Sequence, residues 1–336
     1  MDRRAQKNNR VVQGKRVVVE APPRRRVLHK RHPLGWDKMR VLVTGGSGLL
    51  GSVLVEMLAQ NGHSVIATYN THEPRQIQGV KWVKIDISRG YLLEDLAWKE
   101  KPHALIHSAA MTDVDKCEIE KEKAWKTNVE ATRSAVRAAR AVNAHIIYIS
   151  TDYVFDGEKG NYGEEDLPAP VNYYGLTKLV AEEIVRTSDV LYTIVRPSAI
   201  YGLGGSKKSF AEYVADKLTR GEEVPALVDQ YVSPTYNRYL ASAILKILDT
   251  RPLGTIHVAG QRTNRYEFAQ TIADILGVPK NLVKPAKTQD MKNWLAKRPR
   301  DSSLDTSKAN RLLGYTHENH KALLDFVKEY LEKRRP

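Results

Sequence analysis

Cysteine is almost absent from this chain, which has Cys117 as its one thiol in 336 residues. An internal disulfide is therefore excluded, and the chain suits a reducing compartment. No apolar run approaches the ~20 residues that a membrane helix needs, and the first residues lack the apolar segment of a secretory signal. Repeats are absent, as is any spacing of Cys and His typical of a metal site. We expect a cytoplasmic protein with no membrane partner and no bound metal.

Positive charge is concentrated at the start of the chain. The net charge is +14, and residues 1–38 contain 12 Lys or Arg against 3 Asp or Glu. A basic segment of this kind can bind nucleic acid. Trp36 is its one aromatic residue, however, and no pattern for base stacking accompanies the charge. We therefore predict a disordered basic tail at residues 1–38 and do not expect a nucleic-acid partner.

A glycine-rich turn follows the first predicted strand, at residues 40–44, and an amphipathic helix is predicted after it, to about residue 61. Strand, glycine turn and helix are the context that a dinucleotide-binding motif requires. The glycines permit a tight turn and a close approach of backbone to the pyrophosphate, which lies at the helix N-terminus. The predicted pyrophosphate-binding residues are Gly45, Gly48, Leu49, Leu50 and Gly51.

The second predicted strand lacks the acidic end that NAD-preferring sites use to bind the ribose 2′-hydroxyl. Asn70 and, further on, Arg75 follow it instead. We therefore predict NADPH as the cofactor, with NADH as an alternative, although Arg75 could equally be a solvated loop residue. The third predicted strand ends in Asp86 and Ile87, where a carboxylate could accept a hydrogen bond from the adenine amine. Small residues that would let a cofactor lie against backbone follow the fourth strand: Ser108, Ala109 and Ala110.

Tyr174 and Lys178 lie one turn apart at the start of a helix predicted at residues 176–186. A free Tyr has a pKa of about 10, and a nearby ammonium lowers it. Such a Tyr can give a proton to a carbonyl oxygen as a hydride arrives at the carbon. Thr151 follows another strand, predicted at residues 144–150, so its hydroxyl could hold the same oxygen. We predict a reductase with Thr151, Tyr174 and Lys178 as catalytic residues, because the adjacent Tyr173 has no lysine four residues on.

Beyond residue 200 the strict alternation of strands and helices ends. Helices are predicted at 210–219, 239–249, 267–276 and 321–333, and a strand at 255–260. We predict an α/β fold with a doubly wound parallel (Rossmann) sheet at residues 39–200 and a smaller C-terminal substrate-binding domain mainly at 201–336. Residues from about 237 to 260 are expected to return to the Rossmann sheet.

The Gly-x-x-Gly-x-x-Gly turn and the Tyr-x-x-x-Lys pair resemble the extended short-chain dehydrogenase/reductase family, from residue 39 nearly to the end. The runs at 109–118, 150–157, 229–235 and 298–308 are similar to its dTDP-4-dehydrorhamnose reductase branch. That resemblance implies a dTDP-sugar substrate, dTDP-4-dehydro-β-L-rhamnose, which is reduced at its C4 ketone.

Residue roles follow from the same resemblance. Tyr174 is the implied proton donor, and Lys178 tunes it and binds the nicotinamide ribose. Asn128 matches an Asn that supports a proton-relay water, and Arg196 should flank the nicotinamide. Ser150 is a second candidate for the role of Thr151. The residues implied to contact the substrate are Thr112, Asp113, Ser150, Tyr153, Val154, Phe155 and Arg298.

Two departures from the branch leave alternatives open. Ser108 stands where the family often has Asn, and residues 197–202 lack the aromatic side chains that often follow Arg196. A nucleotide-sugar 4-epimerase is therefore one alternative. The NADP-binding, non-catalytic beta subunit of methionine adenosyltransferase is another, because it resembles the same branch. Some members bind magnesium at a dimer contact, so a homodimer is an option, but no carboxylate cluster here can be assigned to that ion.

Overall fold

A parallel sheet of seven strands forms the centre of the computed structural model, which describes residues 38–205 and 207–334. The predicted tail lies outside the described residues, apart from Lys38. The strand order is β11-β6-β5-β4-β1-β2-β3, and every neighbouring pair is parallel. The strands are β1 (Arg40–Thr44), β2 (Ser64–Tyr69), β3 (Val80–Lys84), β4 (Ala104–His107), β5 (His145–Ile149), β6 (Tyr192–Arg196) and β11 (Gly254–His257). The predicted doubly wound α/β fold is confirmed.

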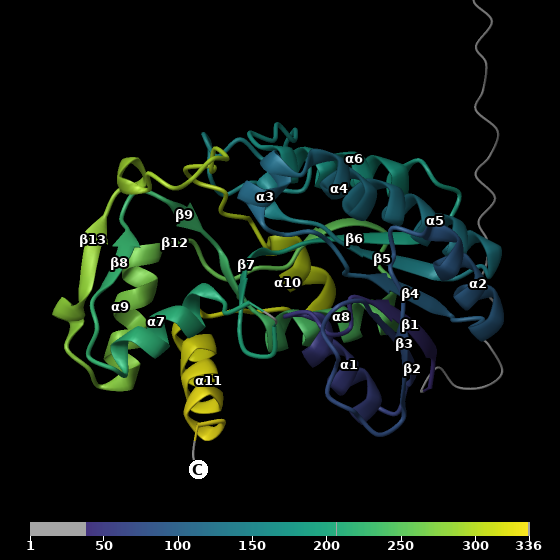
Figure 1. Ribbon diagram of the computed structural model, residues 1–336, viewed down its shortest axis with the longest axis horizontal. Coiled ribbons are helices and arrows are strands. Elements are labelled where there is room, and N and C mark those ends of the chain that lie inside the picture. Colours follow the sequence, from purple (N-terminus) through teal and green to yellow (C-terminus); the bar gives the residue numbers. More distant parts are fainter. Residues whose placement is uncertain (1–37, 206, 335–336) are drawn as a thin grey trace, which may run out of the picture. The chain divides into compact units, whose positions relative to one another are not determined.

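Helices cover both faces of this sheet (Figure 1). Val41 and Val43 of β1 pack into one apolar cluster, and Leu42 between them packs into the other, since side chains alternate along a strand. Every residue of β4 and β5 is buried, which is typical of a parallel sheet covered on both sides. One face carries α1 (Gly51–Gln60), α8 (Asn237–Thr250) and α10 (Ser307–Leu313); the other carries α2 (Gly90–Glu100), α5 (Ala131–Ala141) and α6 (Tyr173–Arg186).

A third apolar cluster holds together what we call the C-terminal lobe, residues 207–236 and 263–334 without α10. Its helices are α7 (Phe210–Leu218), α9 (Arg265–Leu276) and α11 (Asn319–Glu332), with short turns η3 (Lys280–Leu282) and η4 (Thr288–Asp290). Its strands are β8 (Val224–Leu227), β9 (Tyr231–Val232), β10 (Pro234–Tyr236), β12 (Thr263–Asn264) and β13 (Val283–Ala286), and β10 pairs with β7 (Ser198–Tyr201).

β11, which lies far along the chain, pairs with β6 at the edge of the large sheet. The exact division of the chain into two domains near residue 200 stays a prediction. No helix among the described residues has the length and apolar character needed to cross a membrane.

The sheet reverses its direction of growth between β1 and β4. From β1 the chain adds β2 and β3 on one side, and then β4, β5, β6 and β11 on the other. Ligands of open α/β sheets bind at the carboxyl ends of the strands beside such a reversal. The register places Thr44 of β1, His107 of β4 and Tyr148 of β5 in one row. The loops that leave these strands therefore meet at one edge.

Candidate active site

The glycine turn after β1 is built so closely that side chains are excluded from it. Gly45 has a φ of +70°, and a Cβ there would lie 2.8 Å from the Cα of Ala109. A Cβ on Gly51 would lie 2.1 Å from the carbonyl oxygen of Gly45. Helix α1 begins here, and no side chain among the described residues caps its first turn at Leu50. A helix N-terminus left open behind a glycine turn fits a dinucleotide pyrophosphate.

The loop after β4 closes one side of this turn. The Ser108 hydroxyl donates a 2.6 Å hydrogen bond to the carbonyl of Thr44, and the amide of Ala109 donates to the Thr44 hydroxyl over 3.3 Å. Ala110 continues the same loop toward α3 (Val114–Ile119). Ser108 and Ala109 therefore pack closely on the glycine turn, and Gly48, Leu49 and Leu50 lie on the turn itself. The contact of these residues with a cofactor stays a prediction.

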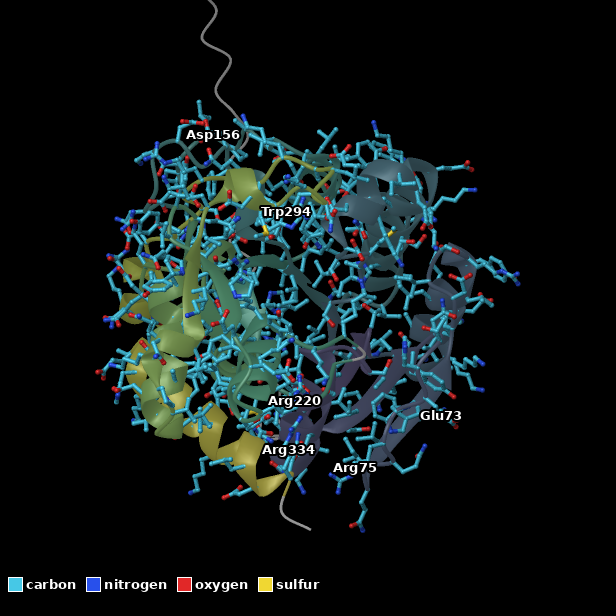
Figure 2. All side chains as sticks on the ribbon, turned by 60° about the vertical axis from the view of Figure 1, so that its left-hand side comes forward. Glu73, Arg75, Asp156, Arg220, Trp294 and Arg334 are labelled. Atoms are coloured by element: carbon cyan, nitrogen blue, oxygen red, sulfur yellow. The ribbon has the colours of Figure 1, made fainter. Side chains whose placement is uncertain are left out.

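A pocket of about 410 Å³ opens beside the glycine turn and the loop after β2. Ser47 and Arg75 both line it, as do the carboxylate side chains of Glu56 and Glu73. Figure 2 labels Glu73 and Arg75. A cation that lines the same pocket as the glycine turn suits a ribose 2′-phosphate. Asn70 follows β2 directly and is exposed, but it does not line this pocket among the described residues.

The two predicted adenine contacts lie beyond the end of β3. The Asp86 carboxylate accepts hydrogen bonds from the Ser88 amide, at 3.0 Å, and from the Ser88 hydroxyl, at 2.7 Å. One oxygen of Asp86 thus already has partners within its own turn. Ile87 is buried in the apolar cluster beneath α2 and α5.

Thr151 and Tyr174 meet at the carboxyl end of β5. Thr151 caps the short turn η2 (Asp152–Val154), because its hydroxyl accepts from the amide of Tyr153 and donates to Asp152 over 3.1 Å. Tyr174 lies in the first turn of α6, which Asn172 caps through a 2.8 Å bond from the amide of Gly175. The Thr151 hydroxyl is close enough to the Tyr174 phenol to lower its pKa.

Burial raises the pKa of Tyr174 above its ordinary value, and the Thr151 hydroxyl opposes this only in part. Lys178 is not among the main causes that act on the Tyr174 pKa, so the lowering by a neighbouring ammonium that the sequence suggested is not found. The physical reason for the rise is desolvation, since a phenolate loses its hydration in a buried site. At neutral pH Tyr174 is consequently a protonated phenol, which is the form that can donate.

Lys178 lies one turn further along α6 and is almost fully buried. Its ammonium donates a 2.7 Å hydrogen bond to the carbonyl of Ile149 and lies 4.3 Å from the ring centroid of Tyr148. Burial lowers the pKa of Lys178 to about 7, although Glu182 acts in the opposite direction. The charge of Lys178 can therefore change near neutral pH.

Asn128 fixes the loop beneath the site. It lies on a π-helical turn, η1 (Lys126–Glu130), between α4 (Lys121–Trp125) and α5. Its side-chain oxygen accepts from the amide of Met111, and its nitrogen donates to the carbonyl of Met111 and to the hydroxyl of Thr177. The oxygen and the nitrogen of this side chain therefore both have partners, and Asn128 links the loop at Met111 to α6 through Thr177. π-helical turns of this kind frequently mark functional sites.

Several predicted contacts have other partners in the structure. The Arg196 guanidinium is buried against Glu182, with bonds of 2.8 and 2.6 Å, and also meets His257. Val154 and Phe155 are fully buried with Tyr162 in a small core cluster. Arg196, Val154 and Phe155 therefore have partners within the protein core around the site, and their contact with a cofactor or substrate stays a prediction.

Arg298 and Asp113 also form ion pairs. Arg298 makes a two-pronged contact with Asp115, at 3.0 and 2.8 Å, and lies over the ring of Trp294. Asp113 caps α3 and pairs with Lys207, while Thr112 beside it is exposed. Arg298 therefore attaches the C-terminal lobe to α3 and is not a free phosphate ligand. Ser150 and Tyr153 remain beside Thr151, and Tyr153 packs edge-on against Tyr174, with ring centroids 6.0 Å apart.

Asp152 is the central residue that sequence reasoning missed. Its buried carboxylate accepts hydrogen bonds from Thr151, from Ser198 at 2.8 Å and from Ser302 at 2.5 Å. Burial raises the pKa of this carboxyl. The position of Asp152 directly after Thr151 was the feature of the sequence that could have indicated its importance. No local sequence pattern predicts Ser302 as its hydrogen-bond partner. Asp152 thus joins β5, β7 and the C-terminal lobe behind the catalytic hydroxyl.

Comparison with known proteins agrees with this geometry. A family model described as the RmlD substrate binding domain matches residues 39–332. The chain belongs to this family. The probable low-salt glycan biosynthesis reductase Agl14 of Haloferax volcanii is 35% identical, over 82% of this chain and 93% of that protein. Methionine adenosyltransferase 2 subunit beta of Pongo abelii is 32% identical, over 81% and 82% of the two chains.

Solved structures give the same assignment. A hypothetical dTDP-4-dehydrorhamnose reductase from Sulfolobus tokodaii is 46% identical with a TM-score of 0.75, over 83% of this chain and 97% of that one. The dTDP-4-dehydrorhamnose reductase of Bacillus anthracis, solved in complex with NADP, is 31% identical with a TM-score of 0.77, over 87% and 99%. By family and fold, the chain is an NAD(P)-dependent oxidoreductase of the RmlD type.

Proposed function

We propose that the chain uses NADPH to reduce the C4 ketone of dTDP-4-dehydro-β-L-rhamnose, which yields dTDP-L-rhamnose. The observation that carries the proposal is that Thr151 follows β5 and acts on the pKa of Tyr174, at the sheet edge that also holds the glycine turn. Similarity to reductases of this name supports the sugar. Arg75, which lines the same pocket as Ser47 of the glycine turn, supports NADPH over NADH.

The chain's own residues handle the proton. NADPH, when held by the glycine turn, would supply the hydride for C4, and the ketone oxygen would gain negative charge as the hydride arrives. Tyr174 is a protonated phenol and donates its proton to that oxygen. Thr151 offers a second hydroxyl that orients the same oxygen. Lys178, held by the carbonyl of Ile149, then stabilises the phenolate through its positive charge.

We also propose that the protein consists of a Rossmann domain at residues 39–200 and a mainly substrate-binding domain at 201–336, with residues near 237–260 contributing to the large sheet. We expect it to lie in the cytoplasm, to bind a dTDP-sugar and to form a homodimer. Light scattering of the purified protein tests the last of these.

The test is NADPH oxidation, followed by absorbance, with dTDP-4-dehydrorhamnose generated in situ. Tyr174→Phe removes the proposed proton donor and should lower the rate by about 10²- to 10⁴-fold. Tyr173→Phe is the matched control, since Tyr173 packs its ring against Lys121 and its hydroxyl has no part in the mechanism. Equal rates in the wild type and in Tyr174→Phe would refute the role of Tyr174.

The similarity to methionine adenosyltransferase 2 subunit beta favours a second candidate, a regulatory subunit that binds NADP without turnover. Thr151, Tyr174 and Lys178 together favour catalysis in this chain. Tight NADPH binding without oxidation of NADPH by any keto-sugar would support the regulatory candidate. A 4-epimerase would instead retain NAD through dialysis and show no net redox.

A further inference from the structure

Two buried serines lie behind the catalytic hydroxyl of Thr151 and take no part in the proposed mechanism. Ser198 of β7 and Ser302 of the C-terminal lobe both donate to one oxygen of Asp152, Oδ2, at 2.8 and 2.5 Å. The other oxygen, Oδ1, accepts from the Thr151 hydroxyl over 3.1 Å. All four side chains are buried. The carboxylate of Asp152 therefore lies between the lobe and the catalytic hydroxyl.

The Thr151 hydroxyl has little freedom to choose its direction. A hydroxyl has one hydrogen to donate and two lone pairs with which to accept. Thr151 gives its hydrogen to Asp152, and one lone pair accepts from the amide of Tyr153 over 3.2 Å. The direction of the O–H bond therefore depends on where Oδ1 of Asp152 lies. Thr151 can donate to a ketone oxygen only by turning its O–H away from that oxygen.

The position of Oδ1 depends in turn on the two serines. An aspartate carboxylate turns about a torsion that has broad minima, so other contacts must fix its plane. Ser198 and Ser302 do this by holding Oδ2, and the hydroxyl of Ser198 also accepts from the amide of Ser233 over 3.1 Å. When the Thr151 hydroxyl turns to a ketone, Asp152 keeps two hydrogen bonds. The cost of leaving a buried carboxylate without donors is thereby avoided.

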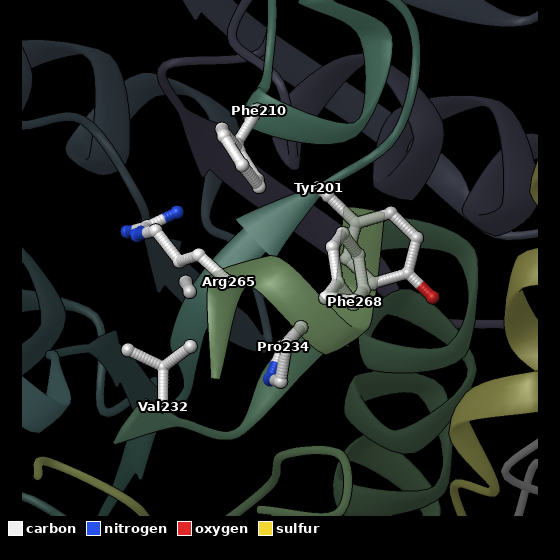
Figure 3. A pocket seen from close by; sticks show the side chains of 7 residues that line it. Tyr201, Phe210, Val232, Pro234, Arg265 and Phe268 are labelled. Carbon is white, nitrogen blue, oxygen red and sulfur yellow. The ribbon is translucent and has the colours of Figure 1, made fainter. Parts of the chain in front are cut away.

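The segment at residues 300–304, which carries Ser302, is attached to the lobe through backbone contacts. The amide of Ser302 donates to the carbonyl of Tyr231 over 3.1 Å. Tyr231 begins β9, and Ser233 follows that strand directly. Figure 3 shows the side chains on either side of Ser233, those of Val232 and Pro234, at a small pocket of the lobe. Ser302 and Ser233 are thus held by the same part of the lobe.

On its other side, the same segment packs against the loop that follows η2. The amide of Asp301 donates to the carbonyl of Gly157 over 3.0 Å. Gly157 has a φ of +84°, and a Cβ there would lie 2.6 Å from the amide nitrogen of Arg300. A Cβ on Gly160 would meet the Asp301 carboxylate. The loop is therefore shaped around this segment, and contacts on both sides fix the position of Ser302.

We propose that Ser302 is a positioning residue for ketone reduction. It holds Oδ2 of Asp152, and Asp152 in turn sets the direction of the Thr151 hydroxyl. Because the segment at 300–304 belongs to the C-terminal lobe, a shift of that segment changes the hydroxyl that orients the ketone. The inference deepens the proposed function and rests on it for the reaction.

The first test is steady-state kinetics of Ser302→Ala in the full chain, with NADPH and dTDP-4-dehydrorhamnose. We expect kcat to fall about 10- to 100-fold, the loss that follows removal of a hydrogen bond to a charged group. The affinity for NADPH should stay within about twofold of the wild type. Ser303→Ala is the matched control and should keep the wild-type kcat. Ser303 is a buried serine of the same segment, but its hydroxyl donates to Asp301.

A double-mutant cycle separates a positioning role from a purely structural one. In a Thr151→Ala background, Ser302→Ala should change kcat by less than about twofold, because the hydroxyl on which Ser302 acts is gone. An equal loss in both backgrounds overturns the inference, as does a folded Ser302→Ala variant with the wild-type kcat. If Ser302→Ala folds poorly, Ser198→Ala gives the same comparison, since it removes the other donor to Oδ2.

Crystal structures of the two serine variants test the inference without turnover. The hydrogen bond from Thr151 to Asp152 should be lost in Ser302→Ala and kept in Ser303→Ala. Its retention in Ser302→Ala overturns the inference. A wild-type protein that does not reduce dTDP-4-dehydrorhamnose would overturn the proposed function, and the crystal structures would still decide whether Ser302 positions Thr151.

Discussion

Replacing Gly175 with alanine should disable the active site without unfolding the protein. Gly175 follows Tyr174 in the first turn of α6, and a Cβ there would lie 2.1 Å from the carbonyl oxygen of Tyr153. Ordinary contact begins at 3.4 Å. That oxygen belongs to backbone, so α6 and η2 must separate by roughly 1 Å, given how densely protein interiors are packed.

The separation acts directly on the catalytic pair. Tyr174 is carried by α6, whereas Thr151 caps η2, so a shift between these elements pulls the two hydroxyls apart. A misplacement of ~1 Å can cost about 10²-fold in rate. We therefore expect kcat of Gly175→Ala to fall about 100-fold. NADPH binding should persist, because the glycine turn after β1 is untouched.

The assay compares kcat, NADPH affinity and thermal unfolding of Gly175→Ala with those of Gly163→Ala. Gly163 is the matched control, because the nearest atom to its added Cβ lies 3.8 Å away and belongs to the Asp166 side chain. Retention of wild-type kcat by a folded Gly175→Ala variant would refute the reasoning. A global loss of NADPH binding would likewise show that the change is not confined to Tyr174 and Thr151.

Two further predictions concern the buried charges of α6. Burial lowers the pKa of Lys178 to about 7. The positive charge that would stabilise the Tyr174 phenolate is therefore present below that pH and lost above it. We expect kcat/KM for reduction to fall as pH rises through about 7. A profile that stays flat between about pH 6 and pH 9 would exclude this role. Glu182→Gln leaves Arg196 buried without its counter-charge and should cost about 3–5 kcal/mol of unfolding free energy, measured by urea denaturation. The double variant Glu182→Leu with Arg196→Met should recover most of that loss, and a single variant as stable as wild type would contradict the argument.

Much of the Rossmann half was predictable from local patterns. Apolar runs such as residues 40–44 and 144–150 predicted strands, and β1 and β5 lie there. The amphipathic run at 239–249 predicted a helix, and α8 spans Asn237–Thr250. The spacing of apolar residues and the glycines that end an element are properties of neighbouring residues, so they can be recognised without knowledge of the fold.

Side-chain partners were less predictable. Arg298 was expected to meet phosphate, but its partner Asp115 lies 183 residues earlier in the chain. Arg196 was expected beside the nicotinamide, yet it is buried against Glu182. An arginine suits a carboxylate as well as it suits a phosphate, so residue type alone could not choose between the two.

The sequence by itself determined the main strands and helices of the Rossmann half, the glycine turn and the one-turn spacing of Tyr174 and Lys178, because each depends on residues within a few positions of one another. Only the tertiary structure decided which groups surround that pair. Ser302 reaches Asp152 across 150 residues, and Asn128 donates to Thr177, the neighbour of Lys178, across 49 residues. Such contacts depend on how layers pack, since a hydrogen bond or a buried charge is selected by what lies nearby in space and not by what lies nearby in the chain.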